Sequence, residues 1–228
     1  MATEPPPTSV QFDPTSTPDE RGKVTVGGDL EPGTLLAAYR AGLFPMRLPD
    51  GELAWWSPDP RAVIVPGSAH VTRSLRQSQR HLTTTVNQAF AQVIRACADR
   101  GRDEYLWITD EVQAAYIELH RLGWAHSVET WATDDSGEPE LVGGLYGVCV
   151  GGLFAGESMF HRRRDASKVA FVTLIDVITE GDRAVERMID VQWMTPHLQS
   201  LGAIDLPRAE FLERSARAQQ LAPPPRLA

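Results

Sequence analysis

Residues 141–158 read Leu-Val-Gly-Gly-Leu-Tyr-Gly-Val-Cys-Val-Gly-Gly-Leu-Phe-Ala-Gly-Glu-Ser, and this stretch decides the fold. Two mostly apolar runs, 141–150 and 153–158, are separated by Gly151-Gly152, a pair that gives the backbone the freedom that a tight hairpin turn requires. Six of the sixteen residues from Leu141 to Gly156 are glycines, so the stretch is too short and too interrupted to span a bilayer. It therefore predicts two antiparallel strands and no membrane segment.

Further strands and helices surround this hairpin in the sequence. Residues 61–65, 127–131 and 187–193 have the pattern of strands, and helices are expected at 34–42, 165–178, 196–202 and 207–221. A further helix is indicated by apolar residues at helical spacing, namely Val86, Ala89, Phe90, Val93, Ile94 and Cys97. Another follows Thr109, a good N-cap, and ends at Gly123. From residue 85 onward this order predicts an α+β fold with a mostly antiparallel sheet.

Two segments are expected to lack regular structure. Residues 1–19 are rich in Pro, Thr and Ser and hold few large apolar side chains, so we expect a flexible N-terminal segment. Residues 55–60, Trp-Trp-Ser-Pro-Asp-Pro, predict a turn-rich aromatic loop because two prolines and an aspartate oppose strand pairing.

The ends and the cysteines indicate where the chain works. No positively charged and apolar leader is visible at the N-terminus. The two cysteines, Cys97 and Cys149, form no CxxC pair, which disfavours a disulfide framework or a thiolate zinc site. We therefore expect a cytoplasmic protein. Nothing in the sequence marks an oligomer interface, so a monomer is the expected state.

Charge is distributed unevenly along the chain. The net charge is −8, which excludes a protein that coats nucleic acid by bulk electrostatics. From Arg61 to Arg102, however, the sequence holds seven arginines and only one acidic residue, Asp99. On charge alone this basic band is either a solvated helix face or a site for phosphates.

The strand at 188–193 carries two polar residues, Asp190 and Gln192. Because side chains alternate along a strand, both are expected on the face shared with Met188, while Ile189, Val191 and Trp193 take the other. A carboxylate and an amide are costly to bury without partners. Either they complete a structural hydrogen-bond network, or they face a cavity in which a substrate supplies the partner.

Other residues suggest how a reaction could or could not proceed. Glu157 follows a glycine-rich strand, so it is either exposed to water at the end of that strand or beside a backbone that a ligand can approach closely. The six histidines have no metal-ligand spacing, and no serine or cysteine has the surroundings of a nucleophile. We therefore expect no metal and no cofactor, and direct transfer between two positioned substrates.

Several motifs, taken together, resemble one family. The chain is similar to the leucyl/phenylalanyl-tRNA–protein transferases from about Gly27 to Phe211, with the motifs in the same order and spacing. The matching segments are Leu36-x-x-Tyr39-Arg40-x-Gly42-Leu43-Phe44-Pro45, Trp55-Trp56-Ser57-Pro58-Asp59-Pro60-Arg61, Trp107-Ile108-Thr109, Gly123-x-Ala125-His126-Ser127-Val128-Glu129, Leu141-Val142-Gly143-Gly144-Leu145-Tyr146-Gly147, Gly156-Glu157-Ser158-Met159-Phe160, Ala166-Ser167-Lys168 and Asp190-x-Gln192. The chain departs from the family at Met46, where Trp is usual, and at Thr195-Pro196, where Asn-Asp is usual.

The resemblance implies an architecture and an activity. It implies a small N-terminal domain, placed at 20–65, and a larger domain like the GNAT acetyltransferases at 66–228. The implied reaction moves Leu, Phe or Met from aminoacyl-tRNA to an acceptor protein with N-terminal Lys or Arg, which marks that protein for degradation.

The resemblance also implies roles for individual residues. Asp190 and Gln192 would be the catalytic pair, with Asp190 orienting Gln192 against the amine. Trp56 and Trp107 would contact the terminal adenosine, Leu145 and Ile189 would line the aminoacyl pocket, and Glu157 would stand at its mouth. The basic band, including Arg73, Arg76 and Arg80, would bind tRNA phosphates.

Two other functions remain compatible with the sequence. Another GNAT-like acyltransferase is one, although residues 161–165 lack the glycine that a pyrophosphate-binding loop before a helix requires. A non-catalytic tRNA-binding protein is the other, and in that protein Asp190 and Gln192 would be dispensable.

Overall fold

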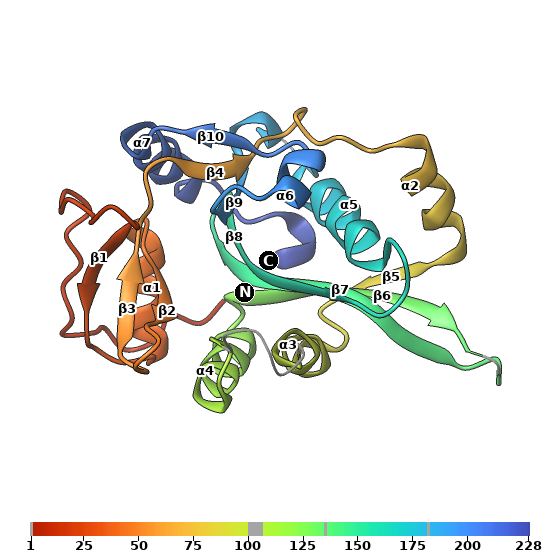
Figure 1. The fold of residues 1–228 in the computed structure, drawn as a ribbon, viewed down its shortest axis with the longest axis horizontal. Helices are drawn as coiled ribbons and strands as arrows, with labels where there is room; N and C mark the ends of the chain where they lie inside the picture. The colour runs from red at the N-terminus through yellow and green to blue at the C-terminus, as the bar shows by residue number, and fades with distance from the viewer. Residues whose placement is uncertain (1, 100–106, 135, 182) are drawn as a thin grey trace.

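Two β-sheets organise the protein, whose computed structural model describes residues 2–99, 107–134, 136–181 and 183–228 (Figure 1). In the described residues the small sheet has the order β1-β3-β2 and the large sheet the order β10-β4-β9-β8-β7-β6-β5. The small sheet comprises β1 (Lys23–Val26), β2 (Phe44–Arg47) and β3 (Leu53–Trp56). The large sheet comprises β4 (Arg61–Ile64), β5 (Thr83–Val86), β6 (Ala125–Thr133), β7 (Pro139–Val150), β8 (Leu153–His161), β9 (Met188–Gln192) and β10 (Ile204–Leu206).

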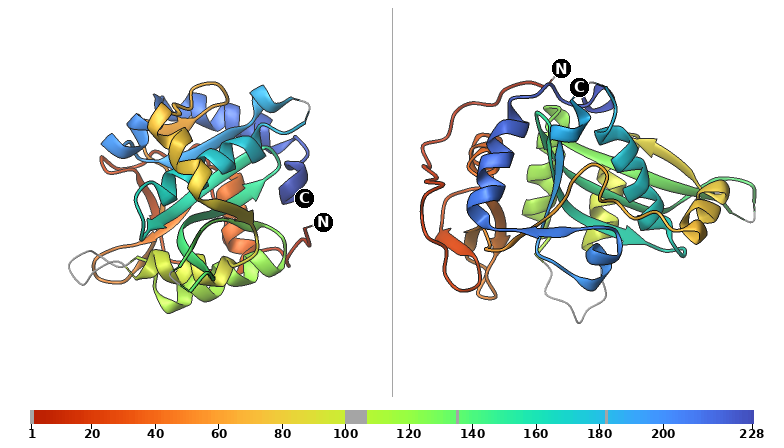
Figure 2. Two further views of the ribbon diagram at one scale, coloured as in Figure 1. Left: turned by 90° about the vertical axis from the view of Figure 1, so that its right-hand side faces the viewer. Right: turned by 90° about the horizontal axis from the view of Figure 1, so that it is seen from above.

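Helices cover both faces of the large sheet. On one face α3 (Phe90–Ala98) and α4 (Asp110–Arg121) pack together against the long central strands, and on the other lies α5 (Ala166–Ile178), as Figure 1 shows. The short helix α2 (Arg73–Ser78), followed by η1 (Gln79–His81), lies beside α5 (Figure 2). The remaining helices are α1 (Pro32–Arg40), α6 (Pro196–Ser200), α7 (Arg208–Gln219), η2 (Ala184–Glu186) and η3 (Pro225–Leu227).

The α+β class with a mostly antiparallel sheet is confirmed. Neighbouring strands of the large sheet run antiparallel except β8 and β9, which are parallel. The hairpin turn falls at Gly151-Gly152 as expected, where Gly151 has φ +59° and a side chain would collide with the carbonyl oxygen of Gln219. Thr109 caps α4, since its hydroxyl accepts a hydrogen bond from the backbone N–H of Val112.

Two local predictions were wrong. Trp55 and Trp56 belong to β3, because pairing with both β1 and β2 outweighs the turn chemistry of the prolines that follow. Val86 ends β5, and the helix begins only at Phe90, after Asn87 turns the chain with φ +60°. Val86 and the apolar residues of α3 both pack into the core, in neighbouring clusters, so the helical spacing of apolar residues extends across the turn although the helix does not.

The two ends of the small sheet's segment connect it with the rest of the molecule. Residues 2–19 form no helix or strand, but Glu4 forms an ion pair with Arg40 and Thr3 accepts a hydrogen bond from the Trp124 indole. At the other end β4 already pairs with β9 and β10, so the large sheet begins at Arg61, inside the range expected for the N-terminal domain.

None of the described helices is long and apolar enough to cross a membrane.

Candidate active site

An apolar cavity of about 430 Å³ lies where the small sheet, the large sheet and α5 meet. Its lining residues are Phe44, Pro45, Met46, Trp107, Leu145, Tyr146, Gly156, Glu157, Ser158, Met159, Phe171, Leu174, Ile189, Val191, Gln192, Trp193, Thr195, His197 and Leu198. Most of these side chains are hydrophobic, and a few polar groups stand among them, the pattern of a small-molecule site that orients its ligand. Met46 and Thr195, two positions at which the chain departs from the family pattern, are both in the lining.

Two β-bulges aim polar residues at this cavity. In β8, Ser158 pairs with Tyr146 and Gly156 pairs with Gly147, which leaves Glu157 without a residue opposite it on β7. Such an extra residue bends the strand and redirects its side chain, and Glu157 is one of the residues that line the cavity.

The second bulge is in β9. Asp190 pairs with Val63 and Gln192 pairs with Ala62, so Val191 is the extra residue. Gln192 then has φ +62°, a left-handed conformation that residues other than glycine rarely adopt. The expectation that Asp190 and Gln192 share one face therefore fails, because the alternation of a regular strand ends at Val191.

Gln192 lies where the two parallel strands separate. The pairing of β8 with β9 ends at Ala155 and Asp190, just before the bulged residues. Across this opening the Gln192 amide nitrogen Nε2 donates a hydrogen bond of 2.8 Å to the carbonyl oxygen of Gly156. The side chain is thus fixed at the cavity wall rather than free to rotate.

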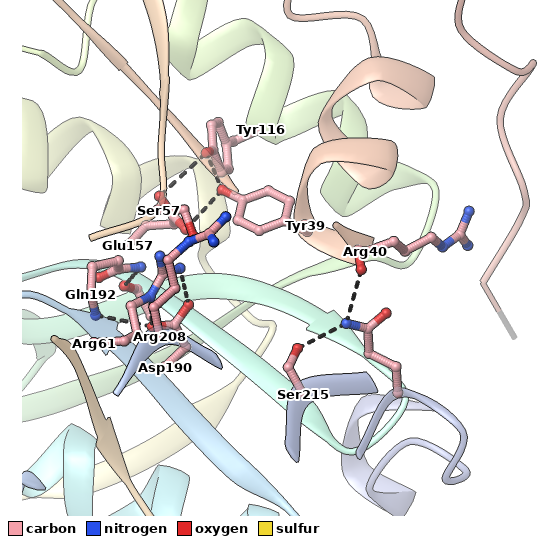
Figure 3. Close-up of polar contacts among 12 residues, drawn as sticks. Tyr39, Arg40, Ser57, Arg61, Tyr116, Glu157, Asp190, Gln192, Arg208 and Ser215 are labelled. Atoms are coloured by element: carbon pink, nitrogen blue, oxygen red, sulfur yellow. Dashed lines mark hydrogen bonds and ion pairs between the residues drawn. The ribbon is translucent and has the colours of Figure 1, made fainter. Parts of the chain in front are cut away.

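Glu157 is held by two tyrosines from other elements (Figure 3). The hydroxyl of Tyr39, on α1, donates to Oε1 at 2.7 Å, and the hydroxyl of Tyr116, on α4, donates to Oε2 at 3.3 Å. The two hydroxyls also contact each other. Burial raises the pKa of both tyrosines well above the usual range, so both keep their protons and remain donors.

The carboxyl of Glu157 has an unusual acidity. Burial raises its pKa to about 8, and the negative charge of nearby Asp190 acts in the same direction. The hydrogen bonds from Tyr39 and Tyr116 and the positive charge of Arg61 oppose this change but do not cancel it. A cation that approaches this carboxyl through the cavity lowers its pKa again and favours the ionised form.

Asp190 faces away from the cavity and pairs with Arg61. Arg61 Nε donates to Oδ1 at 2.8 Å and Nη2 donates to Oδ2 at 2.6 Å, with both side chains almost completely buried. Asp190 Oδ1 also accepts a hydrogen bond of 3.0 Å from the backbone N–H of Gln192. Two roles were considered for the polar residues of this strand. Asp190 belongs to a structural hydrogen-bond network, and Gln192 lines the cavity.

A family model described as leucyl/phenylalanyl-tRNA protein transferase matches residues 63–216, and a model of that family's N-terminal domain matches residues 28–59. The chain belongs to this family. A leucyl/phenylalanyl-tRNA–protein transferase of Stutzerimonas stutzeri is 49% identical over 87% of this chain and 85% of its own length. The corresponding proteins of Yersinia enterocolitica and Idiomarina loihiensis are 49% and 45% identical, over 88% and 94% of this chain and 82% and 89% of their own lengths.

Membership of the leucyl/phenylalanyl-tRNA–protein transferase family confirms the resemblance drawn from the motifs. The chain is an aminoacyl-transferring enzyme. This sets aside both a non-catalytic binding protein and an acyltransferase of another family.

The structure brings most of the predicted site residues together. Trp107, Leu145, Glu157, Ile189 and Gln192 all line the cavity. Asp190 reaches it only through Gln192, and Trp56 is not among the lining residues. Trp56 is buried, donates from its indole to the carbonyl oxygen of Met46, and packs edge-on against Trp193, which does line the cavity.

The arginines of the predicted band do not lie together, and Arg95 is exposed on α3, on the opposite face of the large sheet from α5. Arg73, Arg76 and Arg80 are exposed on α2 and η1. Arg61 is 1% exposed, so its expected place in a phosphate-binding band was wrong, because it neutralises Asp190 inside the protein. Arg100 and Arg102, also counted in the band, lie outside the described residues.

Sequence reasoning missed three groups at the site: Tyr39, Tyr116 and the guanidinium of Arg61. Tyr39 and Arg61 stand within the quoted motifs, which was the available signal. Tyr116 lies within the helix predicted after Thr109, and nothing in the local sequence distinguishes it from a packing residue.

Proposed function

We propose that this enzyme transfers Leu, Phe or Met from aminoacyl-tRNA to the α-amine of an acceptor protein that begins with Lys or Arg. The observation that carries the proposal is one cavity with apolar walls and, at its edge, the carboxyl of Glu157 and the fixed amide of Gln192. The apolar walls suit an uncharged aminoacyl side chain, and the carboxylate suits a cationic acceptor residue. The reaction belongs in the cytoplasm, where charged tRNA is available.

The aminoacyl end of the tRNA occupies the apolar part of the cavity. Leu145 and Ile189 contact its side chain, and Trp107 offers a flat surface on which the terminal adenosine stacks. Trp56 packs against Trp193 on the side away from the cavity lining and so helps to hold that wall in place.

The acceptor's Lys or Arg side chain occupies the space beside Glu157. Without a cation the carboxyl is largely protonated at neutral pH, because its pKa is about 8. A guanidinium or ammonium group beside it favours the ionised form, so binding of the correct acceptor releases a proton. An acceptor with an uncharged first residue provides no such compensation.

The chemical step is an attack by the acceptor amine on the ester of the aminoacyl-tRNA. A C–N bond forms, the C–O bond to the terminal ribose breaks, and the proton lost by the amine passes to the ribose oxygen that leaves. With Nε2 held by Gly156, the Gln192 side-chain oxygen is the atom that accepts a hydrogen bond from the amine. Because the ester is already reactive, positioning and electrostatics provide the rate enhancement.

The body of the tRNA binds a basic surface that we define as Arg73, Arg76, Arg80 and the loop 161–164. Ser78, which ends α2, donates a hydrogen bond of 2.9 Å to Asp165, at the start of α5, so these arginines lie near the β8–α5 loop. That loop contains three consecutive exposed arginines, 162–164. Phosphates are the ligands that such a surface attracts, with an affinity that falls as salt rises.

Acceptor choice tests the proposal. Labelled Leu-tRNA is mixed with three peptides that differ only in the first residue, which is Arg, Ala or Glu, and labelled peptide is measured for wild type and Glu157→Gln. We expect the Arg peptide to be labelled at least tenfold faster than the others by wild type, and this preference to shrink in the variant. Equal labelling of the three peptides by wild type would overturn the proposed acceptor.

A further inference from the structure

Arg61 is a buried charged group that contacts both an ion-pair partner and two aromatic rings. Its side chain is 1% exposed, and the guanidinium carbon lies 4.7 Å from the centre of the Phe44 ring and 4.5 Å from that of Phe211. The planar guanidinium is thus stacked between two aromatic rings, one from the small sheet and one from α7. The two rings and the hydrogen bonds to Asp190 together restrict how the guanidinium can turn.

That orientation is transmitted to Asp190. The two parallel hydrogen bonds from Nε and Nη2, at 2.8 and 2.6 Å, determine the plane of the carboxylate as well as its position. Its negative charge is balanced by the guanidinium, so Asp190 serves neither as a general base nor as a ligand for the acceptor's cation.

From Asp190 the constraint continues to Gln192. Asp190 Oδ1 accepts the backbone N–H of Gln192, whose φ of +62° is costly for a side-chain-bearing residue and needs a partner to hold it. The same turn delivers the Gln192 amide to Gly156. Arg61, Asp190 and Gln192 therefore form one continuous chain of contacts from the interior to the cavity (Figure 3).

A purely structural role explains this chain less well. A buried ion pair contributes little net stability compared with apolar residues of similar volume. Arg61 also has a cost, since among the residues that the structure describes Nη1 is buried without a hydrogen-bond partner.

We propose that Arg61 is a positioning residue for aminoacyl transfer, which acts through Asp190 to hold Gln192 in its left-handed conformation at the cavity. This inference rests on the function proposed above. It assigns Asp190 to the same positioning role and leaves Gln192 as the member of the chain that touches the substrates.

The test compares two variants with a matched control in transfer from Leu-tRNA to a peptide that begins with Arg. Arg61→Lys keeps the charge but loses the paired hydrogen bonds. The double variant Arg61→Met/Asp190→Leu removes both charges and leaves neither unpaired. Arg208→Lys is the control, because Arg208 donates to Ser57 and to the carbonyl oxygen of Pro14 rather than to Asp190.

We expect kcat to fall at least tenfold in both variants, while the KM for Leu-tRNA stays within twofold of wild type. In the control variant kcat should equal that of wild type. The melting temperature of the double variant should stay close to that of wild type. A wild-type kcat in Arg61→Lys would overturn the inference. So would a double variant in which both the melting temperature and kcat equal those of wild type. If the double variant does not fold, Arg61→Lys decides alone. Inactivity of the wild-type enzyme itself would instead count against the proposed function.

Discussion

The hydroxyl of Tyr39 donates a hydrogen bond of 2.7 Å to Oε1 of Glu157, although the two residues are 118 positions apart. This contact joins α1, beside the small sheet, to the bulge in β8 of the large sheet. Together with Tyr116 it surrounds a carboxyl whose pKa burial raises to about 8. The cavity edge is therefore assembled from parts of the chain that meet only in the folded protein.

The raised pKa makes stability depend on pH. Between its ordinary value of 4.5 and about 8, Glu157 holds a proton in the folded protein that the unfolded chain has released. The stabilising contribution is fully present below pH 4.5 and is lost as the pH rises towards 8, by at most about 1.4 kcal/mol per pH unit. Urea unfolding of wild type and Glu157→Gln from pH 4 to 9 measures this. The free energy of unfolding of wild type should fall relative to the variant across this window; a constant difference would contradict the raised pKa of Glu157.

The basic surface predicts a salt-dependent affinity for tRNA. In the variant Arg76→Glu/Arg80→Glu, tRNA binding should weaken, and the slope of log affinity against log salt should become less steep by about one per arginine removed. Arg95→Glu is the control, because Arg95 is exposed on α3, on the opposite face of the large sheet. Filter binding at several salt concentrations measures both. If the double variant keeps its affinity, these arginines are only a solvated helix face.

The apolar walls predict a limit on the size of the aminoacyl side chain. Ile189→Phe adds volume to the cavity wall and should reduce transfer from Phe-tRNA more than from Leu-tRNA, because the larger side chain loses its space first. Val185→Phe makes a comparable change at a side chain that is 81% exposed and should alter neither. The kcat/KM ratio of Phe-tRNA to Leu-tRNA is the measurement. An unchanged ratio in a folded Ile189→Phe variant would show that this cavity does not bind the aminoacyl group.

Local chemistry was sufficient to predict the framework of the fold. The hairpin at Gly151-Gly152 and the start of α4 at Thr109 depend on turn and capping preferences, which a few neighbouring residues determine. Trp55-Trp56 shows the limit of such reasoning. The prolines after it predicted a loop, but pairing with two strands from elsewhere in the chain makes it β3.

The candidate site was predicted in part, and the missing parts have a common cause. Gln192 and Glu157 were named from their motifs, but the bulges that aim them depend on the register with β4 and β7. The partners Arg61 and Asp190 are 129 positions apart, and no periodicity connects them. Arg61 was interpreted as one charge in a basic band because a sequence shows sign and spacing but not burial.

The central claim is that Gln192 positions the acceptor amine at the ester. Gln192→Gly tests it most directly, because glycine tolerates φ +62° and therefore removes the side chain without straining the backbone. Transfer of labelled leucine from Leu-tRNA to a peptide that begins with Arg is followed in a single turnover, alongside the affinity for Leu-tRNA. We predict a rate lower by about 100-fold with an unchanged affinity and a melting temperature no lower than that of wild type. A wild-type rate in this variant would contradict the account.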